Sequence, residues 1–167
     1  DFPLLFMGYY NSVFCMGNET FCDRLAGAGG RGFIIADLPL EDAGELDAFA
    51  TARDLDHIQI VTPLNSDQRL RQISGGASGF LYCVARKGVT GKQTNFDRDM
   101  GAYMQRCRSA TDLPLALGFG IRTPAQVGAI RDVADIAIVG TGALEMWEQK
   151  GVVAYRQYLK DLIGACA

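Results

Sequence analysis

Residues 115–130, LALGFGIRTPAQVGAI, contain the pattern that decides the fold class. A short apolar run predicts a buried strand at residues 115–118, and glycines at positions 118 and 120 follow at its end. Thr123 and Pro124 then match the N-cap and the first position of a helix. A strand, a glycine loop and a capped helix in this order form one βα unit of a parallel sheet.

The same alternation continues on both sides of this stretch. Strands are predicted at residues 3–9, 32–36, 57–61, 79–84, 115–118 and 136–139. Helices are predicted at residues 18–28, 41–53, 66–75, 99–110, 123–132 and 151–165. These elements make about six βα units, an α/β pattern that fits an open doubly wound sheet or a barrel without two of its units. A complete (β/α)8 barrel needs at least about 200 residues, so we expect residues 1–167 to form a single, partial domain.

Composition limits the class of protein and of partner. Hydrophobic residues make up 49% of the chain and charged residues 21%, which is typical of a globular domain. The net charge of −3 does not favour a nucleic-acid or membrane surface, so we expect small molecules or proteins as partners. The chain has no signal-peptide pattern and no apolar run of about 18 residues, and we expect a cytoplasmic location.

Neither cysteine nor histidine indicates a metal centre or a disulfide framework. The five cysteines are spread along the chain without a Cys-x-x-Cys pair. A thiol nucleophile is disfavoured, because no base is near any of these cysteines in the sequence. His57 begins a predicted strand at the end away from the expected functional loops, which favours a structural role. We therefore expect no metal site.

Functional loops of parallel βα folds follow the carboxyl ends of the strands. Two glycine loops follow the last two predicted strands, at residues 118–120 and 140–142. Glycine lets the backbone approach a ligand, and backbone N–H groups at the start of a helix bind anions. The Thr141 hydroxyl can add a donor, so these loops predict a phosphate site, although they could also be simple tight turns.

Three other features are candidates for a functional role because of their position alone. Asp37 follows the second strand and could be a general base, a metal ligand, an orienting acceptor or the start of a turn. Tyr82 lies late in its strand and could face the core or a substrate. Residues 86–97 form a long polar loop containing Thr90, which could close over a ligand or be an insertion without function.

Together these loops closely resemble the tryptophan synthase alpha chain family. The matching segments, in the same order, are Tyr9-Tyr10-Asn11, ADLPLE at 36–41, GVTG at 88–91, GFGI at 118–121 and GTGA at 140–143. The resemblance covers essentially the whole chain. It implies a (β/α)8, or TIM, barrel of which this chain supplies about six βα units, strands 3 to 8.

The family cleaves indole-3-glycerol phosphate into indole and glyceraldehyde 3-phosphate and passes indole to a beta chain that contains pyridoxal phosphate. The resemblance therefore implies an alpha2beta2 partner and no cofactor in this chain. It implies phosphate contacts for Gly91, Gly120, Gly140 and Thr141. It places Tyr82 beside the substrate and Thr90 on a loop that closes over it. Asp37, Tyr9 and Asn11 would serve coupling to the beta chain and the exit of indole.

The resemblance also implies a catalytic Glu and Asp that precede every matching segment. Because neither is found in these 167 residues, we expect the first two units to lie outside this chain and the chain alone to be inactive. Two alternatives remain at this point. One is a non-catalytic fragment that binds a phosphate ligand and the beta chain, and the other is a different phosphate-binding barrel isomerase.

Overall fold

The computed structural model describes residues 2–84, 98–118 and 120–166. Its strands form two parallel sheets, β1-β2-β3 and β4-β5-β6-β7, in chain order. The strands are β1 (Leu4–Gly8), β2 (Gly30–Ile35), β3 (Asp56–His57), β4 (Gln59–Val61), β5 (Leu81–Val84), β6 (Leu115–Gly118) and β7 (Ile136–Ala137). Neighbouring parallel strands joined by helices confirm the predicted βα repeat.

The chain passes from the first sheet to the second between β3 and β4. The strand predicted at residues 57–61 is divided at Ile58, whose N–H donates to the Phe33 carbonyl at 3.0 Å. β3 pairs with β2, whereas β4 pairs with β5. Expecting one regular strand here was wrong, because the chain changes its hydrogen-bonding partner between β3 and β4.

The helices follow the predicted order, with differences at several ends. They are α1 (Tyr10–Met16), α2 (Asn18–Gly27), α3 (Gly44–Thr51), α4 (Asp67–Gly75), α5 (Arg98–Arg108), α6 (Pro124–Ile130) and α7 (Thr141–Gly164), with a 3-10 turn η1 (Leu40–Asp42) before α3. Ser66 and Thr123 cap α4 and α6 as predicted, and Gln126 completes a capping box on α6.

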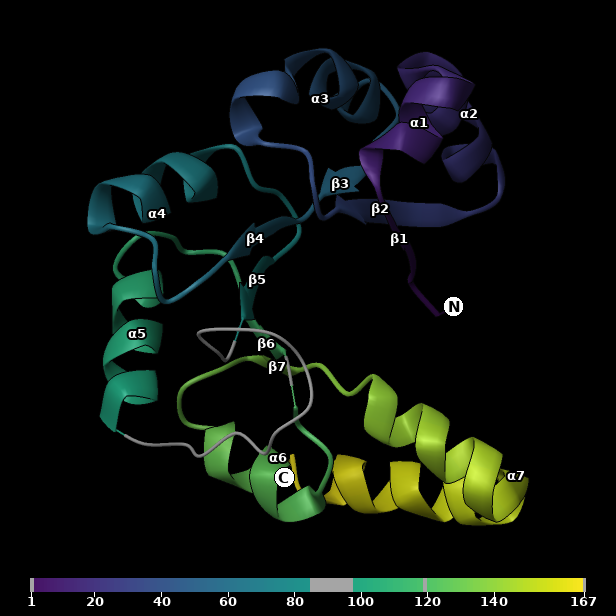
Figure 1. Cartoon of the computed structure of the whole chain (residues 1–167), viewed down its shortest axis with the longest axis vertical. Coiled ribbons are helices and arrows are strands. Elements are labelled where there is room, and N and C mark those ends of the chain that lie inside the picture. Colours follow the sequence, from purple (N-terminus) through teal and green to yellow (C-terminus); the bar gives the residue numbers. More distant parts are fainter. Residues whose placement is uncertain (1, 85–97, 119, 167) are drawn as a thin grey trace.

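The packing on the two faces of the strands distinguishes a barrel from a doubly wound sheet. On the outer face, two clusters pack strands against helices; Leu117 and Met104 lie in one, Phe33 and Leu46 in the other. The inner cluster holds Ile34, Ile58 and Tyr82, with partly buried neighbours that come only from strands or their immediate ends. Helices therefore line one face of a curved row of strands (Figure 1). A doubly wound sheet would have helices on both faces, so this is a partial barrel.

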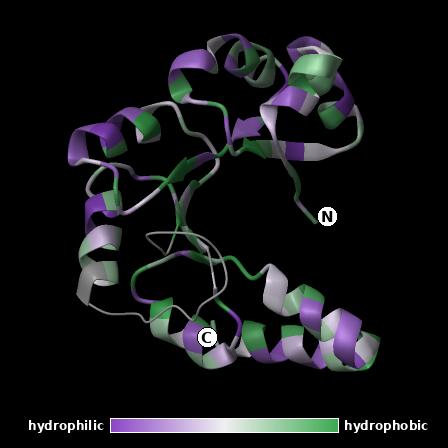
Figure 2. Cartoon of the chain, in the orientation of Figure 1, coloured by the Kyte–Doolittle hydropathy of each residue, from purple (hydrophilic) through white to green (hydrophobic). Residues whose placement is uncertain are grey.

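Hydropathy follows the same division. The strands are largely apolar, while the surrounding helices alternate between apolar and polar residues (Figure 2). Such helices bury one stripe against the sheet and leave the other in water.

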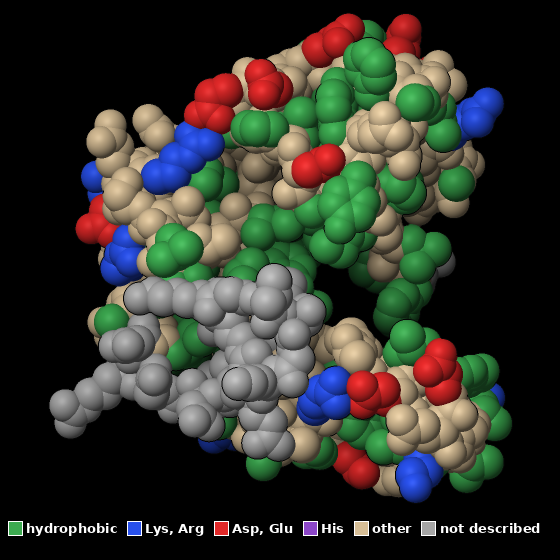
Figure 3. All heavy atoms as spheres, viewed as in Figure 1, with side chains coloured by type: hydrophobic (Ala, Val, Ile, Leu, Met, Phe, Trp, Pro, Cys, Tyr) green, Lys and Arg blue, Asp and Glu red, His purple; other side chains and the backbone are tan. Residues whose placement is uncertain are grey.

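β1 and α7 carry large apolar side chains at the surface. Leu4 and Met7 of β1 are exposed, as are Leu144, Trp147 and Val153 of α7. In the space-filling view the molecule is open between its first strand and α7 (Figure 3).

Two helical segments were not predicted. α1 occupies residues expected to be a loop after the first strand, and no side chain caps its start. α7 begins at Thr141, ten residues before the predicted start at Gly151. Gly151 has φ 77° and ψ 178°, which interrupts the helix, so the prediction identified only its second half.

The helix predicted at residues 41–53 is shorter in the structure. Residues 40–42 form η1 instead, and α3 begins at Gly44. Pro39 is the N-cap of this turn and has an extended backbone, so helical structure begins at Leu40. Among the described residues, no helix is long and apolar enough to cross a membrane.

Candidate phosphate and substrate site

The two predicted glycine loops lie at the carboxyl ends of neighbouring strands. Gly118 ends β6, and Gly120 follows with φ +90°, a backbone conformation that L side chains rarely adopt. Gly140 follows β7 and is the N-cap of α7, so Thr141 and Gly142 are in its first turn. The first N–H groups of a helix have no acceptor within the helix, and they attract anions. This geometry fits the predicted phosphate role of Gly120, Gly140 and Thr141, which remains a prediction.

The two loops are held together by Arg122. Its N–H donates to Gln126 Oε1 at 2.8 Å, and its carbonyl accepts from the Tyr158 hydroxyl at 2.7 Å. Its guanidinium makes two bonds to the Glu145 carboxylate, at 2.7 and 3.0 Å. A Cβ atom added at Gly142 would be 3.1 Å from Arg122 Cγ, so the Arg122 side chain lies against the first turn of α7.

Tyr82 belongs to the inner face of the barrel. Its side chain packs with Ile34 and Ile58 and is 8% exposed. The ring extends over Gly118, where an added Cβ would overlap the hydroxyl and be 2.6 Å from Cζ. Burial raises the pKa of Tyr82, so its hydroxyl stays protonated at neutral pH. Tyr82 is therefore both part of the inner core and a hydrogen-bond donor next to the β6 glycine loop.

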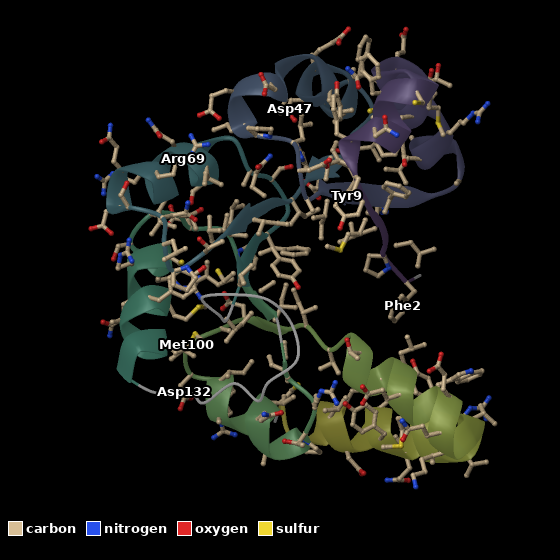
Figure 4. All side chains as sticks on the ribbon, in the orientation of Figure 1. Phe2, Tyr9, Asp47, Arg69, Met100 and Asp132 are labelled. Carbon is tan, nitrogen blue, oxygen red and sulfur yellow. The ribbon has the colours of Figure 1, made fainter. Side chains whose placement is uncertain are left out.

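The residues expected to serve the beta chain lie together at the ends of β1 and β2. Asp37 is exposed and accepts a hydrogen bond from the Tyr10 N–H at 2.7 Å. This bond places the carboxylate at the start of α1. Tyr9 precedes the same helix with an extended backbone and is largely exposed (Figure 4). Asn11 is on the exposed surface of α1, where its Oδ1 accepts from the Cys15 thiol.

Thr90 and Gly91, the other two predicted site residues, lie outside the described residues. Their roles remain predictions from the sequence.

A pocket of about 310 Å³ lies between α1, α2 and α3. Its lining includes Tyr10, Phe14, Asn18, Glu45 and Phe49, and none of the predicted phosphate residues. The Asn18 amide donates to Glu45 Oε2 at 2.8 Å within it. The pocket is on the helical exterior and is separate from the glycine loops.

The lone histidine has the structural position that the sequence favours. His57 is 4% exposed, and its Nδ1 is 2.6 Å from Asp47 Oδ1 on α3. The cysteines are free, and burial raises the pKa of the Cys22 thiol, which disfavours a nucleophilic thiolate at that position. In the described part of the chain, no three His, Cys, Asp or Glu residues are grouped so as to hold a metal ion.

The arrangement brings two glycine loops and the start of α7 together, with one neutral phenol beside them. Arg122 and Glu145 are the charged pair next to the loops, and hydrogen bonding to Glu145 raises the pKa of Arg122. The sequence analysis did not identify either residue. The available signal was an arginine two residues after a loop glycine and immediately before a helix cap, but its partner is in a helix segment that was not predicted.

Comparison with known proteins identifies the family. A family model described as tryptophan synthase alpha chain matches residues 1–162. The tryptophan synthase alpha chain of Syntrophotalea carbinolica is 42% identical over 97% of this chain and 64% of its own length. That of Chloroflexus aggregans is 42% identical over 98% of this chain and 62% of its own length. The chain thus spans less than two thirds of these relatives.

Solved structures agree in fold. The structure of tryptophan synthase from Mycobacterium tuberculosis matches with a TM-score of 0.90 at 29% identity, over 98% of this chain and 62% of the matched chain. The tryptophan synthase a2b2 complex from Pyrococcus furiosus contains a chain that matches with a TM-score of 0.86 at 25% identity, over 97% of this chain and 67% of the matched chain. These matches confirm the partial (β/α)8 barrel over the open sheet. The chain belongs to the tryptophan synthase alpha chain family.

Proposed function

We propose that this chain carries the phosphate-binding part of an indole-3-glycerol phosphate lyase, the alpha subunit of tryptophan synthase. The observation that carries the proposal is the pair of glycine loops after β6 and β7, joined by Arg122 at the start of α7. Such a pair after the last two strands is where barrel enzymes bind a substrate phosphate. Family membership supports the lyase over the isomerase alternative.

The proposed contacts follow from the chemistry of each group. Backbone N–H groups at Gly120 and Gly140 and the Thr141 hydroxyl would hold the phosphate, with Gly91 as the fourth contact expected from the sequence. Tyr82 would donate from its neutral hydroxyl to the substrate, since burial keeps the phenol protonated. Thr90 would contact the substrate from its loop.

The proposed protein partner is a tryptophan synthase beta chain, which would also hold the pyridoxal phosphate. The exposed positions of Tyr9, Asn11 and Asp37 support this, because all three are accessible at the same ends of β1 and β2. The a2b2 complex of the Pyrococcus furiosus relative also supports it. We include a cytoplasmic location in the proposal.

Carbon–carbon cleavage requires an acid to protonate the indole ring and a base to remove the glycerol hydroxyl proton. We assign these functions to the Glu and Asp that the resemblance places before the first matching segment, and so outside residues 1–167. We therefore propose that residues 1–167 bind the substrate phosphate without cleaving the substrate.

The test is to incubate the 167-residue chain with indole-3-glycerol phosphate and measure both binding and released indole. Saturable binding without indole is the expected result. Release of indole would contradict the assignment of the acid and base outside this chain, and absence of binding would contradict the proposed function.

Stimulation of a purified beta chain, lost in Asn11→Ala but retained in a surface control, Asp132→Ala, would support the proposed interface.

A further inference from the structure

We propose that Arg122 is a positioning residue of the phosphate site, which neutralises Glu145 and fixes the two glycine loops relative to each other. This inference rests on the proposed phosphate-binding function. It adds a side chain that contributes to phosphate affinity through its charge and through the position of the loops.

The backbone of Arg122 is fixed from two directions. Gln126 of α6 accepts from its N–H, and Tyr158 of α7 donates to its carbonyl, at 2.8 and 2.7 Å. Tyr158 follows the Gly151 interruption, so this bond ties the β6–α6 loop to the second half of α7. Burial raises the pKa of Tyr158, and nearby Arg122 opposes this shift, so the hydroxyl remains a donor at neutral pH.

The side chain of Arg122 ties the same loop to the first half of α7. Both of its terminal nitrogens bond the Glu145 carboxylate, which is a two-bond geometry that lysine cannot reproduce. The stem lies against Gly142, where an added Cβ would be 3.1 Å from Cγ and 3.0 Å from the Tyr158 hydroxyl. The absence of a side chain at Gly142 therefore allows Arg122 to reach Glu145.

The charges of Arg122 and Glu145 affect the binding of phosphate. Glu145 is in the second turn of α7, close to the helix start that would hold the anion. A carboxylate near a helix start is favourable when no ligand is present, but it repels a bound phosphate. Arg122 cancels that repulsion. The pair is 44% and 41% exposed, so its effect should weaken as salt screens the charges.

The chain contains a closely matched control. Arg108 and Asp135 form another arginine–carboxylate pair, 46% and 45% exposed. Asp135 accepts from the N–H of Leu115, the first residue of β6, whereas Arg122 follows the end of that strand. Arg108→Gln removes the same charge, at nearly the same exposure, from the opposite end of the barrel.

The test measures affinity for inorganic phosphate by titration calorimetry on the 167-residue chain and its variants. Arg122→Gln should weaken binding on the order of tenfold, because Glu145 is left unpaired. Glu145→Gln should keep or improve affinity, since it removes the repulsion. The double variant should recover to within about threefold of the unmodified chain, and Arg108→Gln should change affinity less than about twofold. Arg122→Lys should fall between the unmodified chain and Arg122→Gln.

The outcomes separate the possible failures. Equal affinities of Arg122→Gln and Arg108→Gln would overturn the inference while leaving the proposed function intact. Equal weakening by Arg122→Gln and Glu145→Gln would indicate a structural tie only and would also overturn the charge role. If the unmodified chain does not bind phosphate, the proposed function fails and this inference fails with it. If Arg122→Gln does not fold, Glu145→Gln decides the result, because kept or improved affinity in that variant supports the charge role and weakened affinity overturns it.

Discussion

At the scale of single residues, the contact between Tyr82 and Gly118 joins the inner core to the proposed site. Gly118→Ala would place a methyl group against the Tyr82 ring, and we expect it to lower the free energy of unfolding by about 1–3 kcal/mol. Urea unfolding measures the change. In a Tyr82→Leu background the same substitution should cost much less, because the overlapping ring is gone. An equal loss in both backgrounds would contradict the contact.

Asp47 and His57 form the other decisive pair of residues. Asp47→Ala leaves a buried imidazole without its 2.6 Å partner, so we expect a loss of about 1–3 kcal/mol in the free energy of unfolding. Asp42→Ala, at an exposed carboxylate of the neighbouring turn, should change stability by less than about 0.5 kcal/mol. Chemical unfolding of both variants side by side checks this, and similar small losses would show that the pair is not needed.

At the scale of elements, Glu41 and Arg69 link η1 to α4 by two hydrogen bonds, one of them at 2.9 Å. The bonding to Arg69 lowers the pKa of Glu41 to about 2. A lowered carboxyl pKa stabilises the folded state above the unfolded value of about 4.3, and this contribution is lost as pH falls towards 2. Carbon-detected NMR titration of Glu41 should give the low value. In Arg69→Gln the pKa should return towards about 4.3, and an unchanged pKa would contradict the link.

Gly151 interrupts α7, and this interruption can also be tested. Gly151→Ala forces a side chain into a conformation that only glycine adopts readily, and we expect a loss of about 1–3 kcal/mol in the free energy of unfolding. Gly101→Ala, inside α5 with open space around it, should instead stabilise by about 0.5–1 kcal/mol. Thermal unfolding of the two variants should therefore shift in opposite directions. Shifts in the same direction would mean that α7 continues through Gly151.

At the scale of the whole molecule, the sequence predicted the repeat of strands and helices because its signals are local. Ser66 and Thr123 cap helices through their own neighbours, and apolar runs such as those of β5 and β6 are buried on both faces. α1 has no such cap, and Gly151 looks like a helix start because an interrupted helix resumes there. The local sequence pattern cannot distinguish the uncapped α1 from a loop. Nor can it distinguish the resumption of α7 at Gly151 from the true start of a helix.

The sequence also predicted those parts of the candidate site that depend on local position. Gly120, Gly140 and Thr141 come within four positions of a strand end, so their common end of the barrel could be predicted from chain order alone. Arg122 and Glu145 are 23 positions apart in the sequence, and their pairing depends on packing between α6 and α7. The double role of Tyr82 likewise appears only when its ring is seen over Gly118.

The most direct test of the central claim is an amide NMR titration of the ¹⁵N-labelled chain with inorganic phosphate. If the glycine loops form the phosphate site, the backbone amides of Gly120, Gly140 and Thr141 will shift together and saturate with one dissociation constant. Amides on the helical exterior, such as those of Asn18 and Glu45, should not follow that curve. Shifts that do not saturate, or that centre on residues away from these two loops, would contradict the claim.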